Sequence, residues 1–450
     1  MKDFTTGNIR KQLFFLTMPI LFVNLANFAN LFVNRIWAGK FLNNDAIAAI
    51  SLANVLLYIA LAIGIGIGTG AGTVISQYFG ARKNKKIKQV LVSSLSLSIL
   101  CGIVVFFVFQ FFSLDVLFLI NTPLKIAYMT TTYLKICSFS FVLLYPQLMI
   151  GYIFRAVGDT KKPLIFTLTA LITNTILDPF LMLGLLFFPK LGVEGAGISF
   201  LISVVISFCV AWILLIKNKG VLTFVIRDIL KPSFSSLVKI LKYGIPTGFQ
   251  NLVVSSGIAV VQSFINKYGA PAIAAYGACT IVTQIAVFFC ISFGTSVSII
   301  AGQNRGAQRL DRVVKVTKEG LMICLSTTLI ITVICLIYPE IFLHIFIQAK
   351  SIKTLNIGDH YLKILAIPYL FMTVLMIFDS LFCGVGANFA SMLITAIGIW
   401  GIRIPLIYIL SHIFMLNGVW YGEGLSYVFT AFITGIYYFK GSWKLKGVIN

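Results

Sequence analysis

The stretch AIAAISLANVLLYIALAIGIGIGTGAGTVISQYFGA, residues 46–81, recurs without a gap as AIAAYGACTIVTQIAVFFCISFGTSVSIIAGQNRGA, residues 272–307. Twelve of the 36 aligned positions are identical, and they include the polar residues Thr69 and Gln77 as well as two glycines. Apolar low-complexity sequence aligns by chance at apolar positions, but not at polar and glycine positions in register. The chain therefore carries an internal repeat, a feature that sets the whole fold.

A second stretch shows how far the repeat extends. Tyr133-Leu134-Lys135-Ile136 recurs as Tyr361-Leu362-Lys363-Ile364. We therefore expect an N-terminal six-helix lobe over residues 1–216 and a C-terminal six-helix lobe over residues 243–450, joined by a basic linker over residues 217–242. Parallel repeats are a common plan of transporters, in which the substrate site lies where the two repeats meet.

The composition indicates a membrane protein. Hydrophobic residues make up 59% of the chain and charged residues only 11%, against about 25% charged residues in soluble domains. A bilayer-spanning helix needs roughly 20 mostly apolar residues. Twelve windows qualify: 14–38, 46–76, 91–113, 126–153, 164–188, 193–216, 244–266, 272–301, 320–348, 361–386, 390–412 and 417–439. The expected fold is an all-α polytopic membrane protein with twelve transmembrane helices in two homologous six-helix bundles.

The net charge of +22 is distributed unevenly along these spans. If the N-terminus is inside, the inside segments carry 25 Lys and Arg residues and the outside segments carry 6. This is the positive-inside pattern, and it predicts a multi-pass protein of the cell membrane with both termini in the cytoplasm. The basic clusters lie on separate short loops that face lipid headgroups, so we expect the lipid bilayer, and no nucleic acid, as a partner.

No constellation for catalysis, metal binding or ATP use is visible. The eight Cys residues form no C-x-x-C pair, the three His residues are scattered, and no G-x-x-x-x-G-K-[ST] motif occurs. We therefore expect neither an enzyme nor a cofactor, and no catalytic or metal-binding residue. The glycine run over residues 64–70 lies inside a span, where it favours close helix packing over phosphate binding.

Several motifs resemble the multidrug and toxic compound extrusion (MATE) family. Their order and spacing over the whole chain carry the resemblance: R-A-V-G-D-T-K-K-P at 155–163, N-T-I-L-D-P at 174–179, G-V-E-G-A at 192–196, G-Q-N-R-G-A at 302–307, and Trp400 with Arg403 and Pro405. The resemblance implies a secondary-active antiporter that exports organic cations, drugs or metabolites in exchange for protons or sodium by alternating access. The alternative is a flippase for lipid-linked oligosaccharide of the same superfamily, although basic residues within the spans are few.

Three positions depart from the family pattern and leave the coupling ion open. The first helix of such transporters often carries a Val-Asp pair, which here reads Val33-Asn34. A threonine on the sixth helix of one proton-coupled branch corresponds to Phe200. An acidic residue early in the seventh helix of another branch corresponds to Gln250.

The first candidate site is a carboxyl group in the fifth span. An ionisable side chain in a span is costly and reads as functional by default. Asp178 lies one turn after Asn174 and directly before Pro179, whose ring frees a backbone carbonyl. This group can hold a proton or a small cation, or it can be a hydrogen-bonded Asp at a structural kink. In the resembling branch, the position of Tyr133 carries a tyrosine near that acid; an ordinary interfacial tyrosine is the other interpretation.

The first span carries an amide stripe. Asn24, Asn27, Asn30 and Asn34 follow one another at steps of three and four, which places them on one helix face. Because amides in lipid are expensive, this face must meet protein or water. It lines a cavity or joins helices by amide hydrogen bonds.

The second candidate site lies in the C-terminal half. Asp379 is the only other acid deep in a predicted span, since Glu423 lies near the start of the last one. Asp379 can replace the missing acid of the first helix, or it can form a buried ion pair with Arg403. Gln250 and Gln284 are weaker candidates for polar contacts across the cavity.

Overall fold

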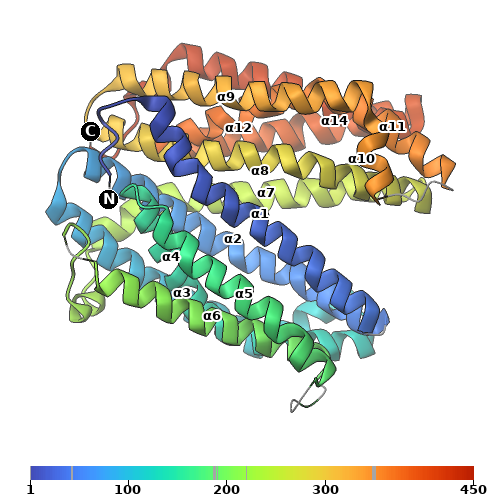
Figure 1. Cartoon of the computed structure of the whole chain (residues 1–450), viewed down its shortest axis with the longest axis horizontal. Helices are drawn as coiled ribbons and strands as arrows, with labels where there is room; N and C mark the ends of the chain where they lie inside the picture. Colours follow the sequence, from blue (N-terminus) through green and yellow to red (C-terminus); the bar gives the residue numbers. More distant parts are fainter. Residues whose placement is uncertain are drawn as a thin grey trace. The chain divides into compact units, whose positions relative to one another are not determined.

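The computed structural model describes residues 2–41, 44–185, 189, 191–218, 220–346 and 351–449, with side chains except those of residues 29–41, 44, 345 and 346. Throughout this described part the chain is helical and contains no strand (Figure 1). The expected all-α fold is confirmed. Hydrogen bonds within helices satisfy the backbone without water, which is what a chain in hydrocarbon requires.

The first half of the chain forms six long helices. They are α1 (Ile9–Phe41), α2 (Asn44–Gly80), α3 (Asn84–Leu119), α4 (Leu124–Ala156), α5 (Lys161–Leu183) and α6 (Val193–Ile216). A short 3-10 helix, η1 (Ile226–Leu230), follows. It lies within the predicted linker, whose last residues already belong to the next long helix.

The second half begins with helices of similar length and ends with more broken ones. They are α7 (Phe234–Asn266), α8 (Ala270–Gly306), α9 (Leu310–Ile337), α10 (Pro339–Phe346), α11 (Ile352–Ala366), α12 (Pro368–Val385), α13 (Asn388–Ala396), the π-helical segment η2 (Ile397–Arg403), α14 (Ile404–Lys440) and the 3-10 helix η3 (Ser442–Leu445).

Two predicted windows are divided in the structure. The window 320–348 spans the end of α9 and the short helix α10, and the window 361–386 spans the end of α11 and all of α12. In both places a proline, Pro339 or Pro368, begins the second helix. Proline has no N–H to continue the preceding hydrogen-bond ladder, so each window contains two helices where one was expected.

The last long helical stretch contains two spans. Eleven helices in the described residues are long and apolar enough to cross a bilayer, and the last, residues 388–440, is 53 residues long. Roughly 20 residues are enough to span. Met415 interrupts this stretch with non-helical backbone angles, φ 49° and ψ −130°. The interruption divides the stretch into an eleventh and a twelfth span, which confirms the predicted number.

Glycines allow the two spans on either side of Met415 to pack closely. A Cβ atom added to Gly418 would lie 2.0 Å from the carbonyl oxygen of Leu410, and one added to Gly422 would lie 2.7 Å from the backbone nitrogen of Ile407. Gly418 thus meets Leu410, and Gly422, which is farther after Met415, meets Ile407, which is farther before it. This is the pairing of an antiparallel hairpin. No larger side chain fits at either glycine.

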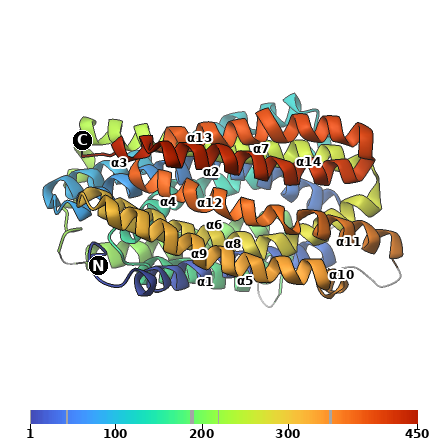
Figure 2. The same ribbon diagram turned by 90° about the horizontal axis from the view of Figure 1, so that it is seen from above.

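The chain divides into two compact units. The first consists of Met1–Asp3 and Met18–Gly248, and the second of Phe4–Thr17 and Phe249–Asn450. In the first unit, α4 packs against α2, α3 and α6, and α5 packs against α6. In the second unit, α8 packs against α9, α11 and α12; Figures 1 and 2 both show α8 and α9 running side by side.

The glycine run of α2 makes a close backbone contact within the first unit. A Cβ atom added to Gly66 would lie 2.7 Å from the Cα atom of Gly248, and one added to Gly70 would lie 2.4 Å from the carbonyl oxygen of Ile240. This small-xxx-small pattern brings α2 and α7 into backbone contact, as in many membrane helix pairs. The predicted packing role of the run is confirmed.

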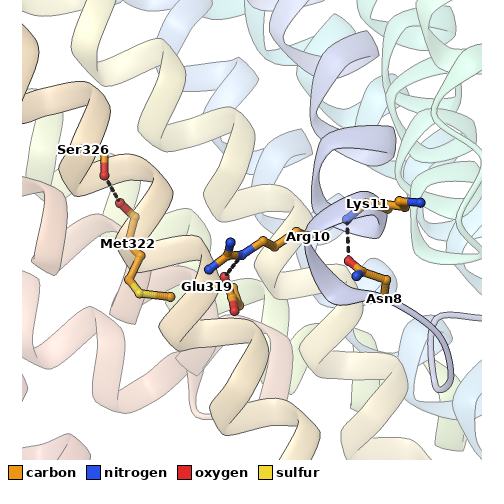
Figure 3. Close-up of polar contacts among 6 residues, drawn as sticks. All are labelled: Asn8, Arg10, Lys11, Glu319, Met322 and Ser326. Carbon is orange, nitrogen blue, oxygen red and sulfur yellow. Dashed lines mark hydrogen bonds and ion pairs between the residues drawn. The ribbon is translucent and has the colours of Figure 1, made fainter.

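The N-terminal segment Phe4–Thr17 folds as part of the second unit. The backbone N–H of Phe4 donates to Gln303 Oε1 at 3.0 Å, and Thr17 and Ser296 share a hydrogen bond of 2.8 Å. Figure 3 shows Arg10 Nε donating to Glu319 Oε2, at 2.6 Å, on α9. The segment therefore belongs to the α8–α9 layer and is not a loose terminus.

Candidate functional site

The carboxyl group of Asp178 lies in a buried polar cluster of the first unit. Its side chain is 4% exposed and that of Asn174 is 7% exposed. Asn174 Nδ2 donates to Asp178 Oδ1 at 3.2 Å, and the hydroxyl of Ser199 on α6 donates to the same oxygen. Asn174 Nδ2 also lies 3.3 Å from Ser199 Oγ. The three side chains close a triangle of hydrogen bonds between α5 and α6.

Local sequence explains how this triangle forms. Asn174 and Asp178 are four residues apart, so α-helical geometry places them on one face of α5. On α6, Gly195 precedes Ser199 by one turn, and a Cβ atom there would lie 2.4 Å from the carbonyl oxygen of Leu181. The missing side chain lets α6 approach α5 closely enough for a short serine side chain to reach the carboxylate.

Tyr133 lies beside this cluster. It is a buried residue of α4, 7% exposed. Its ring packs against α6 near Gly197, where an added Cβ atom would lie 3.4 Å from the ring. The described contacts of Asp178 include no hydrogen bond from Tyr133. The tyrosine is thus a buried neighbour of the site.

The amide stripe of α1 is only partly described. Asn30 and Asn34 lie among the residues whose side chains the structure does not describe. Of the other two, Asn24 is half-buried and Asn27 is exposed. The cavity-lining role of Asn27, Asn30 and Asn34 stays a prediction.

The carboxyl group of Asp379 lies in a second cluster, in the second unit. The amide of Gln250, on α7, donates to Asp379 Oδ1 at 2.8 Å and to Thr395 Oγ1 at 2.8 Å. The hydroxyl of Ser391, on α13, donates to Asp379 Oδ1 as well and lies 3.4 Å from the Gln250 amide. Asp379 is half-buried and Gln250 is 9% exposed. The structure therefore brings two predicted residues together.

Arg403 does not pair with Asp379, contrary to one of the two interpretations of that acid. Arg403 Nε donates to Ser426 Oγ at 3.0 Å, and its guanidinium carbon lies 4.5 Å from the centre of the Tyr427 ring. Arg403, the last residue of the π-helical segment η2, thus contacts two residues of the last span and not Asp379. Gln284, on α8, is exposed and has no described hydrogen bond.

Three hydroxyl groups of these clusters were missed by sequence reasoning. They are Ser199, Ser391 and Thr395. Ser199 directly precedes Phe200, the position at which the resembling branch has a hydroxyl, so a search one residue either side would have found it. Ser391 and Thr395 are four residues apart on one helix face, a spacing readable from the sequence.

The charge environment of the two carboxyl groups distinguishes them from the surface acids. In the described residues, six acids form ion pairs with Lys or Arg: Asp3, Asp45, Asp159, Asp228, Glu319 and Asp359. Asp178 and Asp379 instead receive hydrogen bonds from neutral amides and hydroxyls. Each cluster offers oxygen ligands and a negative charge with no ion-paired cation in the described part of the chain, which suits a proton or a small hard cation.

The part of the chain that the structure describes contains no group of three or more His, Cys, Asp or Glu residues placed to hold a metal ion. The two clusters therefore each rest on a single acidic residue.

Comparison with known proteins agrees with this architecture. The family model MatE matches residues 19–180 and 246–409. The chain is 29% identical over 446 residues to the probable multidrug resistance protein YpnP of Bacillus subtilis, covering 98% of this chain and 97% of that one. It is 28% identical over 439 residues to the probable multidrug resistance protein YoeA of the same organism, covering 96% and 93%. The solved outward-facing structure of a multidrug resistance MATE family transporter has a TM-score of 0.88 at 20% identity, covering 97% of this chain and 96% of that one.

Proposed function

Because the chain belongs to the MatE family of multidrug efflux transporters, we propose that it is a secondary-active antiporter that exports organic cations, drugs or metabolites by alternating access in exchange for protons or sodium. The observation that carries this proposal is a pair of carboxyl groups within membrane spans, Asp178 and Asp379, that have no fixed countercharge among the side chains the structure describes. A span tolerates such a group where it serves transport.

Exchange follows from the chemistry of these groups. A carboxylate in low-dielectric surroundings needs a compensating positive charge, because burying an unpaired charge is very costly. A proton, a sodium ion or a cationic substrate supplies it. If the ion and the cationic substrate cannot bind at the carboxyl groups at the same time, entry of the ion is linked to exit of the substrate. This exchange needs no ATP and fits alternating access.

Asp178 is the proposed primary coupling group. Support comes from its burial and from the two neutral donors, Asn174 and Ser199, that hold one carboxylate oxygen in place. These donors stabilise the ionised group after its ion leaves. Tyr133, buried beside the site, shields it from lipid.

Asp379 is the proposed second ion-binding group, with Gln250 as its positioning residue. Gln250 Nε2 spans two partners, Asp379 and Thr395, and so ties α7 to α12 and α13. The cluster provides a carboxylate oxygen from α12 and hydroxyl oxygens from α13, a ligand set for a hard cation. The roles of Gln284 and of the α1 amides in substrate binding remain part of the proposal.

The proposed location is the cell membrane, with both termini in the cytoplasm. Support comes from the excess of Lys and Arg on alternate loops. The proposed partners are a small-molecule substrate and the bilayer, without nucleic acid. The relatives named above are multidrug resistance proteins, and no observation favours the flippase alternative.

Transport by the purified protein in vesicles, with the proton gradient and the sodium gradient imposed separately, tests the proposal. A fluorescent organic cation serves as substrate. We expect uphill transport with one of the two gradients and none when both are collapsed. Equal movement of substrate with and without gradients would overturn antiport.

A further inference from the structure

A third acid that is buried within the protein, Glu423, lies in a cluster of charged and aromatic side chains that the proposed mechanism does not use. Its sequence position is near the start of the last predicted span, yet its side chain is only 7% exposed. Tyr427, one turn later on α14, donates its hydroxyl to Glu423 Oε1 at 3.3 Å. Because this carboxyl group is buried, water does not stabilise its charge, and another group or a bound proton must do so.

Two buried polar atoms of the cluster have no hydrogen-bond partner among the described residues. They are Glu423 Oε2, an acceptor, and the indole N–H of Trp420, a donor. Trp420 and Glu423 are three residues apart, so both lie on one face of α14. Native proteins leave few buried polar atoms unpaired, so each such atom calls for an explanation.

Arg403 is close to Glu423 but does not neutralise it directly. In the described structure Arg403 forms no ion pair with Glu423; its Nε donates to Ser426 at 3.0 Å, and its guanidinium carbon lies 4.5 Å from the Tyr427 ring centre. The aromatic ring of Tyr427 therefore carries both contacts, with its face against Arg403 and its hydroxyl on Glu423. Arg403 terminates η2, and π-helical segments are frequent at functional sites.

The remaining groups around Glu423 are aromatic hydroxyls. Tyr276 on α8 stacks on Trp420 at 5.8 Å and 7°, and Tyr361 on α11 meets Trp420 edge-on at 4.8 Å and 86°. Tyr369 on α12 donates to Tyr361 at 3.4 Å. With Arg403 and Tyr427, these are the titratable and charged groups that interact with Glu423 or with its cluster. Arg403 is the only fixed charge among them.

The internal repeat gives this cluster a counterpart. Tyr361 repeats Tyr133, and Gly418-Val419 at the entry of the last span repeats Gly192-Val193 at the entry of α6. Tyr133 packs against α6 in the first unit, and Tyr361 packs against Trp420 of the last span in the second. In the first unit, α5 carries Asp178 and α6 carries its partner Ser199. The equivalent helices of the second unit are the two spans before and after Met415, which carry Arg403 and Glu423.

We propose that Glu423 is a proton-exchanging carboxyl group of the second unit, which holds a proton while Arg403 is retained by Ser426 and Tyr427 and releases it when Arg403 moves to pair with it. The carboxyl takes its proton from water admitted from one side of the membrane and returns it to water on the other. This inference rests on the proposed antiport and adds a site to it.

The unpaired oxygen supports the protonated form in the state described. Without a cation within ion-pair distance, a buried carboxylate bears the full cost of an uncompensated charge, whereas the neutral acid does not. A direct pair with Arg403 reverses that balance, because an opposite charge at close range favours the ionised group. The position of Arg403, set by η2, therefore decides whether Glu423 keeps its proton.

Two measurements on the full-length protein test this inference. The first is labelling with a hydrophobic carbodiimide, which adds to protonated carboxyl groups in apolar surroundings, followed by peptide mass analysis. We expect Glu423 to be labelled, with labelling falling as pH rises, and exposed Glu340 to remain unlabelled. Labelling of Asp178 without labelling of Glu423 at any pH would overturn the inference.

The second measurement is proton-driven flux in vesicles by the Glu423→Gln variant, beside a Glu340→Gln control. We expect the Glu423→Gln variant to lose gradient-driven flux but to keep substrate exchange in the absence of a gradient, with unchanged thermal unfolding. Wild-type flux by this variant overturns the inference. Lowered stability that Arg403→Met restores together with flux would show a purely structural ion pair and would also overturn it. Failure of the wild-type protein to transport with any gradient would instead refute the proposed function.

Discussion

The hydroxyl of Ser199 on α6 donates a hydrogen bond to Oδ1 of Asp178 on α5, and the amide of Asn174 donates to the same oxygen. One carboxylate oxygen therefore receives two neutral donors from two helices. This arrangement orients the carboxyl group and ties α5 to α6 at the same point. Coupling and helix association in the first unit depend on the same three side chains.

Replacing Ser199 with Ala removes one of the two donors. We expect a loss of gradient-driven flux and a fall in the free energy of unfolding of about 0.6–2 kcal/mol, as for interhelical hydrogen bonds in membranes. Ser203→Ala is the matched control, because the Ser203 hydroxyl donates only to the carbonyl oxygen of Phe200 on its own helix. Both are checked by flux and by thermal unfolding in detergent. Equal effects of the two substitutions would contradict the role of Ser199.

The Asp379→Asn substitution tests the second cluster. The amide of Gln250 contacts Asp379 directly, whereas Arg403 does not, so stability should be largely retained while coupled flux falls. A double-mutant cycle with Gln250→Leu should show a coupling energy of about 0.5–3 kcal/mol in thermal unfolding, as neighbours in one network do. Additional replacement of Arg403 with an apolar residue should not restore the Asp379 variant. Restoration would reinstate the ion pair that the structure does not show.

The contact between α2 and α7 predicts a strong size limit at Gly70. A Cβ atom there would lie 2.4 Å from the carbonyl oxygen of Ile240, so Gly70→Ala should lower the free energy of unfolding by about 1–3 kcal/mol through overpacking. At Gly277 an added Cβ atom meets nothing within 4 Å. Gly277→Ala should therefore be neutral or stabilising by up to about 1 kcal/mol. The measurement is thermal unfolding of the Gly70→Ala and Gly277→Ala variants. A Gly70→Ala variant as stable as the wild type would refute the close contact.

The proposed orientation predicts opposite accessibility of two loops. Single cysteines at Lys161 and Lys267, in a variant lacking the eight native cysteines, are offered a membrane-impermeant thiol reagent on intact cells. Lys267 precedes α8 and should react from outside, whereas Lys161 begins α5 and should react only after the membrane is opened. Reaction of both from the same side would contradict the topology.

Much of the fold could be predicted from the sequence, because apolar length and the repeat act over many residues at once. The division of the windows around Pro339 and Pro368 was not anticipated, although proline at a helix start is a readable signal. The hairpin at Met415 was placed correctly between two windows. The structure adds that the two spans on either side of Met415 pack with their backbones in contact, because Gly418 and Gly422 have no side chains.

The candidate site could be predicted only in part. Asp178 and Asn174 share a cluster because four-residue spacing in one helix fixes their proximity. The contact between Gln250 and Asp379 joins residues 129 positions apart, which no periodicity reveals. Serine partners escaped notice because serine is common in membrane helices and most of its hydroxyls bond their own helix. The sequence places Glu423 near the start of the last span, but not in a cluster with Tyr276 and Tyr361, which contact Trp420 from other helices.

The most direct test of the central claim is gradient-driven export by Asp178→Asn in vesicles, measured beside Asp115→Asn. Both substitutions remove one negative charge, but Asp115 is exposed on α3 and Asp178 is 4% exposed on α5. The amide at position 178 keeps the shape of the side chain and cannot take up a proton near neutral pH. We expect Asp178→Asn to be present in the membrane at the wild-type level without gradient-driven export, and Asp115→Asn to export normally. Wild-type export by Asp178→Asn under the same gradient would contradict the account.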